Sequence, residues 1–205
     1  MKLFFAPGAC SLSPHIALRE AGLDFQLQKV DTRTKTLDGG GDFLAVNGKG
    51  YVPVIELDDG ERLTEGPAIV QYIADLAPGS GLAPPAGTRE RVRLQEWLNF
   101  ITSELHKVFS PLFSAETPAE FKEIAKKKLT ARFDWLAAQL KGRPYLMGER
   151  FTVADGYLFV ILNWTGYVGI DLALWPVLQE FQARVAARPK VQDAMRAEGL
   201  LKKAA

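Results

Sequence analysis

The first 80 residues alternate short apolar runs with turn residues, a pattern that predicts a small α/β unit. Residues 3–5 form an apolar run that stops at Pro7-Gly8, as a buried strand followed by a turn does. Residues 11–21 are helix formers that end before Gly22, and residues 25–30 alternate broadly in polarity as a second strand. Strand, helix and strand in this order predict a parallel pair with a right-handed crossover.

The next segment predicts a hairpin followed by a helix. Residues 34–50 contain few apolar positions and three consecutive glycines, so we expect irregular or weakly helical structure there. Residues 52–57 and 62–64 are expected to pair as a hairpin, and a helix is expected from Pro67 to residue 76. The whole reads as a β-α-β unit followed by β-β-α.

Beyond residue 80 almost every segment has the periodicity of a helix. Proline and glycine are concentrated at 78–81 and 84–87, which predicts a linker. The predicted organisation is therefore an α/β domain at 1–80, a linker at 81–87 and an all-helical domain at 88–205. Thr152 and Asp155 have the spacing of a capping box that opens one of these helices. The expected helices are 88–113, 118–140, 152–169, 177–187 and 191–200.

Composition narrows the class of protein. With 47% hydrophobic and 24% charged residues the chain can bury a core, and a net charge of +1 indicates neither a nucleic-acid nor a membrane partner. The longest nonpolar stretch, 157–170, is shorter than the ~20 residues that span a bilayer, so we expect a buried helix. The apolar start is too short for a signal peptide, and a single cysteine cannot form an internal disulfide. We expect a cytoplasmic location.

The lone cysteine, Cys10, follows a strand and a Pro-Gly turn at the start of the first predicted helix. A thiol there feels the positive end of the helix dipole, which we expect to lower its pKa below the ordinary value of about 8.5. Residue type alone favours a small buried hydrophobe over a functional thiol. Its position makes Cys10 a candidate for chemistry.

Two further features lie at Pro53 and Glu65. Pro53 interrupts an otherwise regular strand, so either this strand is an edge strand or the Val52-Pro53 bond is cis and presents the Val52 backbone to a ligand; sequence alone favours the edge strand. Glu65-Gly66 opens a helix directly after a short strand. The helix amides could bind a carboxylate and Glu65 an ammonium, or Glu65 simply favours the helix dipole.

The long helix at 88–113 carries an uncharged polar stripe opposite its apolar face. The stripe is either a solvated surface or the lining of a cleft. Two histidines and one cysteine cannot build a standard structural zinc site, and no glycine-rich nucleotide motif is present in the sequence. The stripe consists of Asn99, Ser103, His106 and Ser110.

Taken together, these features resemble the glutathione S-transferases of the bacterial beta class. The resemblance covers essentially the whole chain and is carried by Pro7–His15, Lys49–Pro53, Leu63–Ile69 and His106–Leu112. It implies a thioredoxin-like N-terminal domain of order β-α-β-α-β-β-α, an all-α C-terminal domain, a homodimer, glutathione as co-substrate and no metal. It also implies that Pro53 is the cis proline of that fold.

The resemblance assigns roles to individual residues. Cys10 would lie against the glutathione sulfur, with a mixed disulfide as one option, and Val52 would pair through its backbone with the cysteinyl part. Glu65 and Gly66 would hold the γ-glutamyl end, and Lys35 the glycine carboxylate. Cys10 and His106 are the expected catalytic residues, and the helical domain would close the site with Asn99, Ser103, His106 and Lys107. Gly48 and Tyr51 depart from the family pattern, which usually has proline and glutamine there.

The expected reaction is attack of the glutathione thiolate on an electrophilic carbon of a small apolar compound. Two alternatives stay open: thiol-disulfide exchange or reductive dehalogenation through Cys10, and a non-catalytic binding or regulatory protein of the same fold. Four aromatic residues are candidates for the apolar pocket, although their spacing suits the core equally: Phe109, Phe113, Trp164 and Tyr167.

Overall fold

The computed structural model describes residues 1–201, which divide into two compact units. The first unit contains Met1–Ala83 and the described residues from Ala187 onward, and the second contains Pro84–Ala186. This division differs from the expected helical domain at 88–205, since residues 187–201 pack with the N-terminal unit. Residues 202–205 of that expected domain lie outside the described part of the chain.

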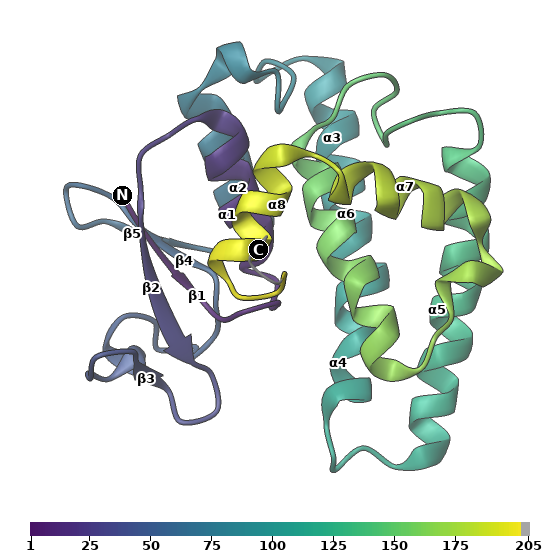
Figure 1. Ribbon diagram of the computed structural model, residues 1–205, viewed down its shortest axis with the longest axis horizontal. Coiled ribbons are helices and arrows are strands. Elements are labelled where there is room, and N and C mark those ends of the chain that lie inside the picture. The colour runs from purple at the N-terminus through teal and green to yellow at the C-terminus, as the bar shows by residue number, and fades with distance from the viewer. Residues whose placement is uncertain (202–205) are drawn as a thin grey trace. The chain divides into compact units, whose positions relative to one another are not determined.

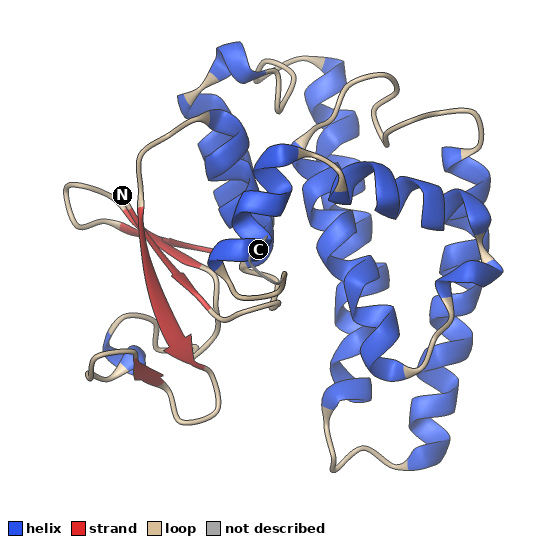
Figure 2. Ribbon diagram, in the orientation of Figure 1, coloured by secondary structure: helices blue, strands red, loops and turns tan. Residues whose placement is uncertain are grey.

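The first unit is built on a five-stranded mixed sheet, drawn in red in Figure 2. Its strand order is β3-β2-β1-β4-β5. β1 and β2 are parallel, with Leu3 opposite Leu27, as the strand-helix-strand pattern predicts. β4 runs antiparallel to both β1 and β5, which confirms the predicted hairpin. The strands are β1 (Lys2–Phe5), β2 (Gln26–Asp31), β3 (Thr36–Leu37), β4 (Val54–Glu56) and β5 (Arg62–Thr64).

The first unit also contains three α-helices among its described residues: α1 (Leu12–Ala21), α2 (Gly66–Leu76) and α8 (Pro189–Ala197). α1 packs against both α2 and α8 (Figure 1). α1 ends as predicted at Gly22, whose φ of 68° is the left-handed conformation that glycine adopts without a Cβ clash. A short 3-10 helix, Pro78–Ser80, follows α2.

The second helix of the expected β-α-β-α-β-β-α order is reduced to one 3-10 turn, Phe43–Ala45. The glycines at 39–41 have φ of 88°, 100° and 115°, which no right-handed helix can accommodate, so a longer helix cannot form before Asp42. The Asp42 side chain caps the short turn by accepting from the Leu44 N–H. Phe43 is fully buried in a cluster with Phe4 and Val54.

α8 is attached to the first unit by buried polar groups. The Glu198 carboxylate accepts from the Gly8 N–H at 2.9 Å and lies 2.8 Å from His15 Nδ1. Because a guanidinium only donates, the Arg19 Nε–H at 2.9 Å from His15 Nε2 makes that nitrogen the acceptor, so His15 carries its proton on Nδ1 and donates it to Glu198. Arg188 adds a bidentate pair with Glu20 at 2.7 Å.

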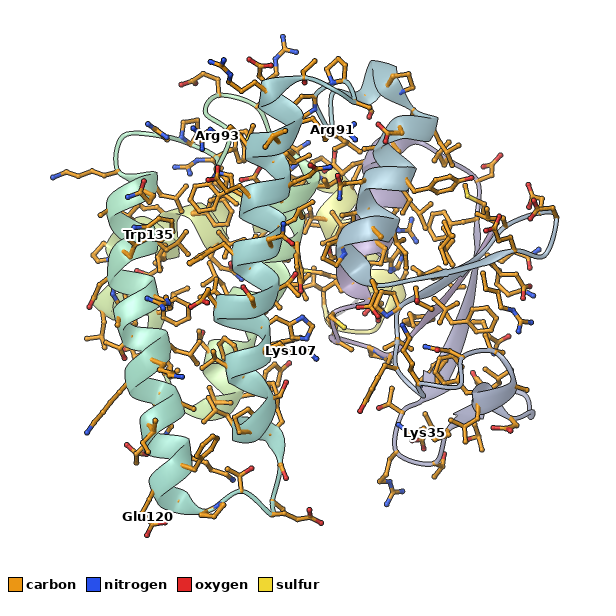
Figure 3. The ribbon with its side chains drawn as sticks, turned by 180° about the vertical axis from the view of Figure 1, so that it is seen from behind. Lys35, Arg91, Arg93, Lys107, Glu120 and Trp135 are labelled. Atoms are coloured by element: carbon orange, nitrogen blue, oxygen red, sulfur yellow. The ribbon has the colours of Figure 1, made fainter. Side chains whose placement is uncertain are left out.

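The second unit is helical, as predicted. Its helices are α3 (Arg89–Phe100), a π-helical segment (Ile101–His106), α4 (Lys107–Phe113), α5 (Ala119–Leu140), α6 (Val153–Asn163) and α7 (Pro176–Ala186), with 3-10 turns at Trp164–Val168 and Leu172–Leu174. α6 is buried along nearly its whole length, which explains its apolar sequence. Trp135 of α5 lies against Trp97 and Phe100 of α3, with ring centroids 5.7 and 4.7 Å apart (Figure 3). Among the helices of residues 1–201, none combines the length and apolarity that a membrane crossing needs.

The predicted capping box at the start of α6 is confirmed. The Asp155 carboxylate accepts from the Thr152 N–H at 2.8 Å, the Thr152 hydroxyl at 2.9 Å and the Leu146 N–H at 2.8 Å. Burial raises the pKa of Asp155 to about 6, against the lowering effect of these donors. One side chain therefore joins the chain before α6 to the first turn of that helix.

We expect Asp155→Ala to lower the free energy of unfolding by about 3 kcal/mol or more, because three buried donors lose their acceptor at about 1–3 kcal/mol each. Urea unfolding monitored by tryptophan fluorescence measures the change. Asp193→Ala is the matched control, because the ion pair of Asp193 with Arg196 lies in solvent and should contribute little to stability. Equal losses in the two variants would contradict the structural role of Asp155.

Candidate functional site

Cys10 lies where the sequence predicts, directly before Ser11, the N-cap residue of α1. Its thiol is partly buried and donates to the Val52 carbonyl oxygen, with Sγ and the oxygen 3.2 Å apart. This contact joins two segments 42 residues apart in sequence. The thiol is thus aimed at the backbone of the residue that precedes Pro53.

The turn that carries Cys10 is held by its own backbone and by Ser11. The Ser11 hydroxyl donates to the Ala6 carbonyl at 3.2 Å and accepts from the Ala6 N–H at 3.1 Å, so it closes the turn instead of capping α1. Gly8 adopts a φ of 72° and donates its N–H to Glu198. These bonds fix the approach of the chain to Cys10.

The Val52-Pro53 peptide bond is cis, as the family resemblance implies. The edge-strand interpretation of Pro53 is wrong, because β4 begins only at Val54 and is paired on both sides, with β1 and with β5. Asn47, which is 7% exposed, supports this segment by donating from Nδ2 to the Tyr51 carbonyl at 2.7 Å.

Two residues other than glycine have positive φ within residues 1–201, Lys35 at 60° and Glu65 at 67°. Such a conformation costs about 1–3 kcal/mol and persists where the surroundings impose it, often at functional sites. Both residues belong to the set expected from the family resemblance. The strain is therefore an independent reason to regard them as functional.

Lys35 lies on the turn between β2 and β3 (Figure 3). Its Nζ donates to the Gly50 carbonyl at 2.9 Å and lies 5.5 Å from the centre of the Tyr51 ring. Gly50 has a φ of 67°, and a Cβ there would lie 3.2 Å from the Leu44 side chain and 3.3 Å from Lys35. Position 50 therefore favours glycine. The Tyr51 side chain is 70% exposed and presents its ring beside the Lys35 ammonium group.

Glu65 presents an exposed carboxylate at the N-terminus of α2. Lys49 Nζ lies 2.6 Å from Glu65 Oε1 and 2.9 Å from the Thr64 hydroxyl. The Ala68 and Ile69 N–H groups donate to the Glu65 carbonyl, whereas the Gly66 N–H has no acceptor within the helix. An anion at Gly66 and a cation at Glu65 would both be stabilised there.

In the second unit the expected polar stripe is interrupted by the π-helical segment. The Lys107 N–H donates to the Thr102 carbonyl, five residues back, and the Ser103 hydroxyl donates to the Asn99 carbonyl at 2.9 Å. A π turn holds more residues than an α turn, so a period of 3.6 residues does not apply across it. Asn99, Ser103 and Lys107 are exposed. His106 is instead partly buried against α6, although Lys107 follows it directly in the chain (Figure 3).

His106 has a partner that the sequence did not indicate. Its Nδ1 lies 2.6 Å from the hydroxyl of Tyr157, and its ring packs edge-on against Trp164 at 4.9 Å. Burial, and secondarily the charge of Lys107, lower the pKa of His106 to about 4, so the imidazole is neutral at pH 7. A neutral imidazole keeps one N–H donor and one acceptor.

The four aromatic pocket candidates differ in exposure. Phe109 is fully buried and Trp164 is 7% exposed, so both belong to the helical core. Phe113 and Tyr167 are 50% and 73% exposed and remain available to an apolar ligand. Within residues 1–201, no group of three or more His, Cys, Asp and Glu side chains is arranged to hold a metal ion.

Comparison with known proteins places this chain in a family. Residues 8–76 match the glutathione S-transferase N-terminal domain and residues 100–189 the glutathione S-transferase C-terminal domain. Glutathione S-transferase GstA of Escherichia coli O157:H7 is 48% identical over 98% of this chain and 100% of its own length. The chain belongs to the glutathione S-transferase family.

Solved structures agree on the whole fold. A sphingomonad glutathione S-transferase complexed with glutathione is 50% identical, with a TM-score of 0.95, over 98% of this chain and 100% of that one. The bacterial beta-class glutathione S-transferase of Sphingomonas chungbukensis is 49% identical, with the same TM-score and coverage. The resemblance to the beta class is confirmed, and so is the pairing of a thioredoxin-like domain with a helical one.

Acidification should destabilise the protein through His106. The unfolded state binds this proton near pH 6.5 and the folded state only near pH 4, so between these values the unfolded state holds more protons. We expect the difference in unfolding free energy between the wild type and His106→Gln to fall as the pH is lowered from 6.5 to 4, by up to about 1.4 kcal/mol per pH unit.

The difference between wild type and variant is the quantity to measure, because Asp155 acts in the opposite direction. Its pKa of about 6 lies above the ordinary value of 3.8, so ionisation of Asp155 lowers the unfolding free energy as the pH rises from 3.8 to 6. Denaturant titrations at half-unit steps from pH 4 to pH 7 provide the two curves. Parallel curves would show that His106 titrates normally.

Proposed function

We propose that this protein catalyses attack of the glutathione thiolate on an electrophilic carbon of small apolar compounds. The observation that carries the proposal is the order of charged and polar groups around Cys10 in the first unit. Lys35 offers a cation, the Val52 backbone a hydrogen-bonding edge, and Glu65 an anion. This order is complementary to a peptide with a carboxylate at one end, a thiol in the middle and an ammonium at the other.

Each group has a defined task in this proposal. Lys35 binds the glycine carboxylate, Val52 pairs with the cysteinyl backbone, and the Gly66 N–H with the Glu65 carboxylate receives the carboxylate and ammonium of the γ-glutamyl end. The Cys10 thiol, which donates to Val52 in the free protein, turns its proton toward the glutathione sulfur. A donor to that sulfur favours the thiolate and so lowers the pKa of the substrate.

From the helical unit we assign Asn99, Ser103, His106 and Lys107 to glutathione by family similarity. A neutral His106 suits a hydrogen-bonding role, because burial disfavours the imidazolium. The exposed rings of Phe113 and Tyr167 suit an apolar co-substrate. In the reaction the thiolate forms a carbon–sulfur bond while the electrophile loses its leaving group, and no electron is transferred to the protein.

Thiol-disulfide exchange is a second candidate activity, favoured by the partly buried thiol of Cys10 beside the Val52 carbonyl. In this reaction the Cys10 thiolate attacks a disulfide that contains glutathione, forms a mixed disulfide with glutathione and releases the other thiol. A second glutathione thiolate then regenerates Cys10 and leaves as oxidised glutathione. Both activities use the same glutathione-binding groups.

We also propose that the protein acts as a homodimer in the cytoplasm and needs no metal ion. The single cysteine supports a reducing compartment, and the dimer follows from similarity to the beta class. Light scattering coupled to size exclusion, and activity after chelation, check these assignments.

Replacing Cys10 by alanine separates the two activities. We expect conjugation of 1-chloro-2,4-dinitrobenzene to fall by at most about tenfold, because one hydrogen bond to the thiolate contributes about 0.5–1.5 kcal/mol. Exchange with a mixed disulfide of glutathione should fall to the uncatalysed rate. Loss of both activities, with glutathione binding intact, would instead make Cys10 essential for thiolate formation.

Replacing the two terminal charges tests the direction of binding. We expect Lys35→Met and Glu65→Gln each to raise the KM for glutathione about ten- to a hundredfold, because a charge-assisted bond contributes about 1.5–3 kcal/mol. Lys29→Met is the control, since it removes an exposed charge from β2. If the wild type is not retained by immobilised glutathione and turns over no model electrophile, the non-catalytic alternative holds.

A further inference from the structure

The carboxylate expected to receive the glutathione ammonium already has a cation bound to it. Lys49 Nζ lies 2.6 Å from Glu65 Oε1, with side chains 50% and 71% exposed respectively. The same Nζ donates to the Thr64 hydroxyl at 2.9 Å. The bond joins residues 16 apart in sequence, the loop before Pro53 and the start of α2.

The loop that carries Lys49 is not free to move away, because Asn47 organises it. The Lys49 N–H donates to Asn47 Oδ1 at 3.2 Å, the Gly50 N–H donates to the Asn47 carbonyl at 2.8 Å, and Asn47 Nδ2 donates to Tyr51. The backbone of Lys49 therefore stays beside Glu65. Only its flexible side chain can leave the carboxylate.

We propose that Lys49 is a built-in competitor for the Glu65 carboxylate, and that it limits how strongly the protein distinguishes glutathione from analogues without the α-ammonium group. This inference rests on the proposed function, in which Glu65 receives that group. It adds a specificity-determining residue that does not itself hold the ligand.

The physical argument is one of charge balance. Two ammonium groups beside one carboxylate repel each other, so the ligand must displace Lys49 or share a carboxylate that is already neutralised. An exposed ion pair is weak and screened by solvent, so a ligand can displace Lys49 from Glu65. The free energy of breaking the pair lowers the affinity only of ligands that bear the ammonium group. A ligand without the ammonium leaves the Lys49–Glu65 pair intact.

Lys35 shows why the position of Lys49 is distinctive. Lys35 Nζ donates to the backbone carbonyl of Gly50, a neutral acceptor, so its charge remains available to a ligand carboxylate. The charge of Lys49 is instead compensated by Glu65. Two lysines of one region therefore have opposite expected effects on glutathione binding.

The test compares two ligands across three variants by isothermal titration calorimetry. The ligands are glutathione and glutaryl-cysteinyl-glycine, which lacks only the α-amino group. The variants are Lys49→Met, Lys49→Arg as the charge-conserving control, and Lys29→Met as a control for loss of an exposed charge on β2.

We expect Lys49→Met to bind glutathione about two- to fivefold more tightly than the wild type, with no gain for the analogue. The ratio of the two affinities then rises, while both control variants keep the wild-type ratio. The gain should shrink at high salt, because screening already weakens the ion pair in the wild type.

An unchanged ratio overturns the inference, and equal weakening of both ligands overturns it in favour of a direct contact between Lys49 and a ligand carboxylate. In either case a wild type that binds glutathione leaves the proposed function standing. A wild type that binds neither ligand overturns the proposed function, and the role of Lys49 with it.

Discussion

The turn that carries Cys10 depends on a buried carboxylate supplied by the far end of the chain. Glu198 accepts the Gly8 N–H on one oxygen and the His15 Nδ1–H on the other, and Arg19 fixes the tautomer of that imidazole. A buried carboxylate that accepts from two donors cannot shift without breaking both hydrogen bonds. Glu198, although far from Cys10 in sequence, therefore helps to fix the backbone turn that carries Cys10.

In the described part of the first unit, the two residues other than glycine that have a strained backbone conformation are also charged. Lys35 and Glu65 both have positive φ, and each bears a charge that the proposed function assigns to glutathione binding. Such positions resist optimisation for stability alone, because a glycine would relieve the backbone but remove the charge. Lys49 pairs with one of these two residues, Glu65, so the two charges are not equally exposed to a ligand.

Much of this could be predicted from the sequence. Periodicity located the strands, α1 and the hairpin, and local turn chemistry located Gly22 and the capping box of Asp155, because these features depend on neighbours in the chain. The cis bond before Pro53 came only from the family resemblance, since the residues alone favoured an edge strand. The groupings that periodicity missed, such as His106 with Tyr157, arise from tertiary packing. The adjacent hydroxyls of Thr102 and Ser103 were an unused signal for the π-helical segment, because both donate to backbone carbonyls four residues back.

The position of α8 has a consequence for how the protein is made. The first unit is discontinuous along the chain: its sheet precedes the entire helical unit, whereas Glu198, directly after α8, follows that unit. During synthesis the Gly8 N–H and the His15 Nδ1–H therefore cannot donate to the Glu198 carboxylate until the chain that follows the helical unit has left the ribosome. Biosynthesis thus completes the helical unit before the region around Cys10 acquires its final geometry.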